Sequence, residues 1–253
     1  MRRFLPALLP LALLVAAPAV AAPENLVPRL EALAASGSGE AAYHLGMIHH
    51  MGLAGVPKNP AKALAQFKLA AERGDPLGAY KLGCFYAGQG EGVVRRDPKL
   101  ALRWKLVAAE AGYALAQEEV SELYAGVGEY AKGSVWLQAA ARQGSPRALM
   151  TLGVLYDPQT ADLGVGKDPV KSFGYYSLFF NKMDQPELLP AAKALKDEAV
   201  KRMTEAELEQ AEAMIAAWQD QPTPLTVKAR LGLEAAERLL EPAGEAATPP
   251  PAG

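Results

Sequence analysis

The feature that most constrains this chain is a two-helix unit that recurs along it. In its clearest copy, Leu82 and Tyr86 follow Gly78 at intervals of four residues, which places all three on one face of a helix. A glycine-rich stretch follows. Asp97 then offers a side chain suited to begin a second helix, in which Trp104 lies. The unit therefore predicts a helix, a turn and a second helix.

Further copies of the unit align on an apolar anchor in the first helix. These anchors are Leu45, Leu82, Val120 and Leu152, so the unit recurs roughly every 35 residues. The repeats are expected at 39–75, 76–112, 113–144 and 145–182. Their structural positions are held by Leu45, Gly46, Leu82, Gly83, Tyr86, Asp97, Trp104, Tyr124, Trp136, Leu152, Gly153, Tyr156 and Asp168. Two helices per unit at this period indicate an α-solenoid.

The repeated pattern is A-x3-L-G-x2-Y, then G-V-x2-D, then A-x2-W-x3-A-A-x2-G. It resembles the Sel1-like repeat family, which is related to the tetratricopeptide proteins, and the resemblance covers about residues 24–218. It is weakest in the third copy, where Val120 and Ser121 replace Leu-Gly. The resemblance implies an all-α solenoid of about four helix-turn-helix repeats with capping helices at both ends. It implies an interaction scaffold and does not by itself imply a reaction.

The segments outside the repeats differ from one another in composition. Residues 24–37 predict an N-terminal capping helix, because a solenoid end needs a cover for its apolar face. Residues 186–220 predict C-terminal capping helices. Residues 221–253 are rich in Pro and Ala and predict a partly disordered tail, although 226–240 could form a helix.

The first 21 residues have the pattern of a secretory signal peptide. Arg2 and Arg3 precede an apolar run, and small residues ending at Ala21 suit cleavage there. The alternative is a membrane anchor, but prolines interrupt the run and it is short for a membrane span. We expect an exported bacterial protein, periplasmic or secreted, without a stable anchor after cleavage. Without the two arginines, 24 basic residues face 28 acidic ones, which disfavours nucleic-acid binding.

Few residues in the sequence are arranged for chemistry. His44, His49 and His50 share one helix, but their spacing prevents all three from lying on one face, so no metal site is expected. Cys84 is the only cysteine, which excludes an internal disulfide, and its own repeat contains no histidine to activate it. We therefore expect no cofactor, no metal and no enzymatic activity.

By analogy with tetratricopeptide solenoids, the first helix of each repeat is expected to line a concave groove. The positions facing this groove would be Tyr43, Met47, His50, Leu77, Tyr80, Cys84, Glu118, Glu122, Arg147 and Met150. Aromatic residues and Met suit contact with a peptide or protein segment. The alternative, equally open at this point, is that Tyr43 and Tyr80 pack between adjacent repeats.

The sequence thus predicts an exported, non-enzymatic protein–protein interaction scaffold with an unidentified protein or peptide partner, acting in an envelope process. The alternative is a cell-wall-directed ligand binder or hydrolase, because penicillin-binding or β-lactamase-like activity has been assigned to some secreted members of the family that the chain resembles. A third possibility is a homodimer formed through the C-terminal region.

Overall fold

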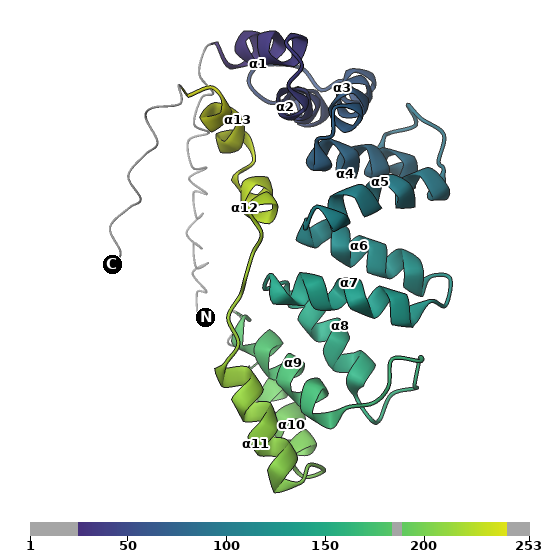
Figure 1. Cartoon of the computed structure of the whole chain (residues 1–253), viewed down its shortest axis with the longest axis vertical. Coiled ribbons are helices and arrows are strands. Elements are labelled where there is room, and N and C mark those ends of the chain that lie inside the picture. Colours follow the sequence, from purple (N-terminus) through teal and green to yellow (C-terminus); the bar gives the residue numbers. More distant parts are fainter. Residues whose placement is uncertain (1–24, 184–188, 242–253) are drawn as a thin grey trace, which may run out of the picture.

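The computed structural model describes residues 25–183 and 189–241, and within these ranges every regular element is a helix. Successive helix pairs stack into an arc with one open side (Figure 1). The predicted all-α solenoid is therefore confirmed. The expected signal peptide, residues 1–21, lies outside the described residues, as do residues 242–253 of the expected tail.

The four helix pairs follow one another in chain order. The pairs are α2 (Gly39–Met51) with α3 (Pro60–Glu72), α4 (Pro76–Cys84) with α5 (Pro98–Glu110), α6 (Ala114–Ala125) with α7 (Tyr130–Arg142), and α8 (Pro146–Tyr156) with α9 (Pro169–Asn181). A π-helical turn, η1 (Phe85–Gln89), extends α4. The flanking helices are α1 (Leu26–Ala35), α10 (Leu189–Val200), α11 (Glu205–Ala216), α12 (Pro224–Leu231) and α13 (Leu233–Leu239).

Side-chain caps explain where most of the repeat helices begin. Asn59 and Asp168 accept hydrogen bonds of 3.0 Å from the N–H groups of the third residue beyond them, and a proline follows each. The first helix of three repeats is capped in the same way, by Ser38, Asp75 and Ser145. The third repeat departs from this pattern, because Tyr113 occupies the N-cap of α6 and offers no side-chain acceptor.

Each repeat buries its anchor and needs a small residue where its two helices cross. In the first repeat, a Cβ added at Gly46 would lie 2.5 Å from the ring of Phe67. In the third repeat Ser121 holds the corresponding position, and Gly133 on α7 provides the space instead, since a Cβ there would lie 3.0 Å from the carbonyl oxygen of Ser121. The third copy thus keeps the packing through a glycine on the opposite helix.

Within the expected tail, the stretch 226–240 that could form a helix is occupied by two short helices, α12 and α13. Residues 220–240, here called the C-terminal strap, include α12 and α13 and run across the open side of the arc from α11 to α1 and α2 (Figure 1). Ala236 and Leu240 are buried in the same apolar cluster as Leu30 of α1. Arg29 donates a hydrogen bond to the carbonyl oxygen of Leu240. The strap thereby covers the N-terminal end of the solenoid.

Chemical cross-linking tests whether the strap closes the arc. Lys228 Nζ lies 2.9 Å from a carboxylate oxygen of Glu40, so a carbodiimide should couple the two into an amide. Mass spectrometry of digested monomer should detect this cross-link. The Lys228→Arg variant keeps the charge but cannot form the amide, and it serves as the control. A cross-link found only in dimers, or not found at all, would contradict the closure.

Candidate functional site

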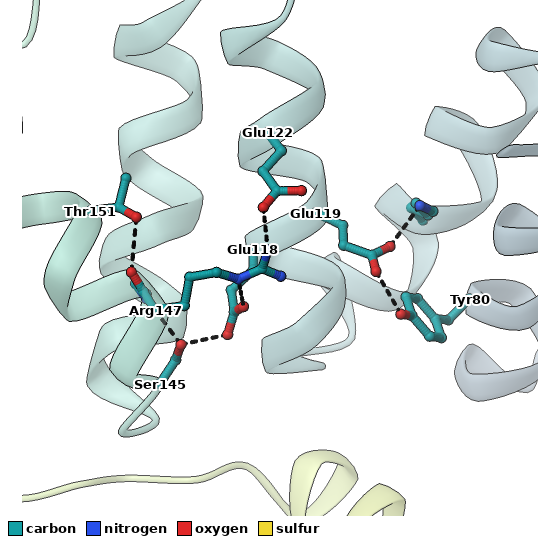
Figure 2. A network of polar contacts seen from close by, with 9 residues as sticks. Tyr80, Glu118, Glu119, Glu122, Ser145, Arg147 and Thr151 are labelled. Atoms are coloured by element: carbon teal, nitrogen blue, oxygen red, sulfur yellow. Dashed lines mark hydrogen bonds and ion pairs between the residues drawn. The ribbon is translucent and has the colours of Figure 1, made fainter. Parts of the chain in front are cut away.

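A network of polar side chains centres on the acidic helix α6. Glu119 lies between two partners: the Tyr80 hydroxyl donates a 2.8 Å hydrogen bond to one of its carboxylate oxygens, and Lys105 Nζ lies 2.6 Å from the other (Figure 2). Only 6% of the Lys105 side chain and 16% of the Glu119 side chain are exposed. This ion pair is therefore largely removed from water and joins α4, α5 and α6.

Arg147 of α8 pairs with the other two acids of α6. Its Nε donates a 2.8 Å hydrogen bond to Glu118, and its Nη1 donates to Glu122 (Figure 2). Ser145, the N-cap of α8, also donates its hydroxyl to Glu118. The acidic stretch is thus paired with basic and hydroxyl groups of its neighbours, and it links the third repeat to the second and the fourth.

Several residues predicted to line a groove are buried. Tyr43, Leu77, Tyr80, Cys84 and Glu118 are each less than 9% exposed, so the expectation that they face an open groove is wrong. The rings of Tyr43 and Phe67 lie 6.4 Å apart, and Tyr80 packs edge-on against the next repeat's Tyr113 at 5.0 Å. Tyr80 therefore takes the alternative role of packing between adjacent repeats, whereas the cited ring contact of Tyr43 lies within its own repeat.

The other predicted groove residues retain access to solvent. Met47 and His50 are partly buried, whereas Glu122, Arg147 and Met150 are exposed. Glu122 and Arg147 lie against each other (Figure 2), and both line a small hollow of about 120 Å³ between α6, α7 and α8. Met150 instead lines a larger cavity of about 320 Å³ beside α9 and α10. The predicted groove is thus divided between separate patches.

The histidines and the cysteine offer no assembled chemical site. Burial lowers the pKa of His49 and His50, which favours their neutral forms. Burial raises the pKa of the Cys84 thiol, and neighbouring Glu119 adds to the rise, so the thiol remains protonated. Among the described residues, no group of three or more His, Cys, Asp or Glu side chains is placed to hold a metal ion.

The C-terminal strap binds the solenoid through a second polar cluster, at the turns that precede α6 and α8. The Thr223 hydroxyl donates a 2.8 Å hydrogen bond to the carbonyl oxygen of Gly112. The Thr226 hydroxyl donates to Oε1 of Gln143 at 2.7 Å and accepts a 3.0 Å hydrogen bond from the N–H of Ala114. Thr226 therefore provides an acceptor for the first N–H group of α6, a helix whose own N-cap residue offers no side-chain acceptor.

Neither Gln143 nor Thr226 was predicted as a site residue. The signal that could have found them is the missing cap: the position held by Ser38, Asp75 and Ser145 in the other repeats is Tyr113 in the third. A helix N-terminus without a side-chain acceptor leaves an N–H group that must find a partner elsewhere. The sequence does not show which distant residue provides that partner.

A model of the Sel1 repeat family matches residues 39–75, 76–113, 130–145 and 146–179. The solved structure of a Sel1 repeat protein from Oxalobacter formigenes is 20% identical, covers 85% of this chain and 79% of that protein, and has a TM-score of 0.54. A protective antigen of uropathogenic Escherichia coli strains with an SLR fold is 23% identical, covers 88% of this chain and 53% of that protein, and has a TM-score of 0.46.

Among curated proteins, chitin synthase regulatory factor 3 of Schizosaccharomyces pombe is 28% identical over 146 residues. The match covers 54% of this chain and 15% of that relative, so the similarity concerns a small part of the fungal protein. The match to the Sel1 repeat model confirms the resemblance predicted from the repeat pattern.

Breaking the buried ion pair of α6 should destabilise the protein. Lys105→Met leaves Glu119 without its cation in a largely dry site, and we expect the free energy of unfolding to fall by about 3 kcal/mol. Urea denaturation measures the change. The double variant Lys105→Met with Glu119→Gln should recover part of the loss, because the buried charge is gone and Tyr80 keeps an acceptor.

Lys132→Met, which removes an exposed cation paired with Glu129, is the control and should have little effect. Equal losses of stability in Lys105→Met and Lys132→Met would show that the buried ion pair stabilises the protein no more than the exposed pair does.

Proposed function

The chain belongs to the Sel1 repeat family, and we propose that it is an exported, non-enzymatic scaffold that holds a protein or peptide segment against the inner side of its arc. Sel1 repeats typically form protein–protein interaction scaffolds. One observation carries the proposal for this chain: the open side of the arc already holds a peptide segment, the C-terminal strap, through main-chain and side-chain hydrogen bonds. A surface that binds its own segment in this way is suited to bind another.

The proposed location outside the cytoplasm rests on the N-terminal sequence pattern of residues 1–21. In the part of the chain that the structure describes, no helix is both long enough and apolar enough to cross a membrane. The fungal relative is named as a regulatory factor of a synthase, which supports a regulatory role in an envelope process. The alternative role as a cell-wall-directed hydrolase gains no support from Cys84, whose thiol is buried and protonated.

Analysis of the N-terminus tests the export proposal. When the full chain is expressed in a Gram-negative host, the protein recovered from the periplasm should begin at Ala22, because the small residues before it suit signal peptidase. Edman sequencing or mass spectrometry of the intact protein reads the result. A cytoplasmic protein that retains Met1 would reject export.

Capture from an envelope extract tests the scaffold proposal. The double variant Glu122→Ala with Met150→Ala removes two exposed side chains of first helices α6 and α8, and it should reduce recovery of a wild-type partner at least about tenfold. The double variant Val127→Ala with Val135→Ala alters exposed residues elsewhere in the third repeat and is the matched control. Quantitative mass spectrometry compares the three proteins. A partner retained equally by all three, or none captured by any, would count against the scaffold.

A further inference from the structure

We infer that the C-terminal strap occupies the partner-binding edge of the solenoid, so that a partner segment must displace it and must share its chemistry. This edge, here called the inner edge, consists of the turn residues 38–40, 112–114 and 142–145. The partner class is a peptide with two hydroxyl residues three positions apart and a lysine two positions after the second, followed by a leucine-bearing helix. The inference rests on the proposed function, because it names the occupant and the regulation of the same face.

The inner edge presents fixed hydrogen-bonding groups to the strap. Gln143 is 4% exposed, and its Nε2 donates to Gln117 Oε1 at 2.9 Å and to the Gly112 carbonyl at 2.8 Å. These bonds orient the amide so that Oε1 faces the strap. There it accepts from the Thr226 hydroxyl at 2.7 Å and from the Thr223 N–H at 3.1 Å. The subsite is thus held in place by residues of the repeats and selects a pair of hydroxyl groups.

The subsite would be costly to leave empty. Without the strap, the N–H of Ala114 would lose its 3.0 Å hydrogen bond to Thr226, and Oε1 of Gln143 would lose its donors. Buried polar groups that lose their partners destabilise a protein unless other donors and acceptors replace them. The third repeat therefore favours an occupied edge, whether the occupant is the strap or a segment with the same groups.

Two turns of the repeats leave space for this occupant. A Cβ at Gly144 would lie 2.3 Å from the Asp220 carboxylate, and a Cβ at Gly112 would lie 2.9 Å from the Thr223 methyl group. The corresponding turn glycine of the first repeat, Gly74, has no atom within 4 Å of its added Cβ. All three have φ between +81° and +91°, so backbone conformation alone does not distinguish them. Close approach to the strap distinguishes Gly112 and Gly144 from Gly74.

Charge complementarity favours a cation at one position of the partner. Lys228 of the strap pairs with Glu40 at 2.9 Å, close to partly buried Asp75. Burial raises the pKa of Tyr113 to about 12, and the charge of nearby Arg230 opposes the rise. Lys228 thus meets a carboxylate of the inner edge, and Arg230 lies near Tyr113 of the same edge. A segment with a cation at the position of Lys228 fits this surface, whereas an acidic residue at that position would meet the like charge of Glu40.

The short helices of the strap suit it for replacement by a partner segment. Its helices have eight and seven residues, lengths that are unstable in isolation, so they depend on docking for their structure. The strap is tethered to α11, which gives it an effective local concentration in about the millimolar range. A partner segment in solution must overcome this advantage, so an intact strap should suppress binding and a weakened strap should permit it.

The test uses the mature full-length chain and a fluorescein-labelled synthetic peptide of residues 219–241. Fluorescence anisotropy measures peptide binding to the wild type and to the Thr223→Val, Thr226→Val double variant, which keeps the shape of the strap but removes both hydroxyl groups. We expect the double variant to bind the peptide at least about tenfold more tightly than the wild type. A peptide carrying the same two valines should show no such gain. The chain variant Thr204→Val, which alters the cap of α11 outside the inner edge, should bind as the wild type does.

If the double variant binds the peptide no more tightly than the wild type does, the inference is overturned, whether the strap is docked or released. The Lys228–Glu40 cross-link reports whether the strap is docked. If it remains docked in the double variant, the hydroxyl groups do not hold it; if it is released and the peptide still fails to bind, the edge does not accept a segment in trans.

The outcome is separable from that of the proposed function. Tighter peptide binding by the double variant, without any partner captured from envelope extract, would leave the strap as an internal closure and reject the scaffold. A captured partner that the 219–241 peptide does not displace from the double variant would reject this inference and leave the scaffold standing.

Discussion

Each helix pair of a solenoid can bury its apolar face only against its neighbours, so the two ends of the stack must be covered. At one end of this chain, α10 and α11 pack on α9. At the other end, α1 packs on α2, and Ala236 and Leu240 return from the far end of the sequence to complete the same cluster. The protein therefore closes its arc with its own C-terminal segment, and the position of the strap follows from this requirement.

The third repeat contacts the strap that closes the arc, and it also forms part of the proposed binding edge. It lacks the Leu-Gly pair and the side-chain cap of the other repeats, and each defect is compensated from outside α6. Gly133 accommodates the bulk of Ser121, Lys105 and Arg147 pair with the acids, and Thr226 accepts a hydrogen bond from the first N–H of α6. A repeat whose stability depends on neighbours couples the strap to the centre of the solenoid. Displacement of the strap by a partner would consequently remove the hydrogen bond between Thr226 and the N-terminus of α6.

Local patterns determined how much could be predicted. Anchors such as Leu45 and caps such as Asp168 act within a few residues of themselves, so the repeats and their helices were readable from the sequence. The groove could not be read in this way, because the burial of Tyr80 and Cys84 depends on how closely adjacent repeats approach. The docking of the strap could not be predicted for a related reason: the sequence allowed a helix at 226–240, but contacts with distant residues such as Glu40 and Gln143 position it.

Hydrogen–deuterium exchange of the wild-type protein tests the central claim most directly, namely that the strap and the third repeat form one closed unit. The N–H of Ala114 donates to Thr226 in the strap, so its protection should depend on strap docking. The account predicts that Ala114 and the strap amides from 227 to 231 exchange with the same opening free energy. Strap amides that exchange at the rate of an unfolded chain, while Ala114 remains protected, would contradict it.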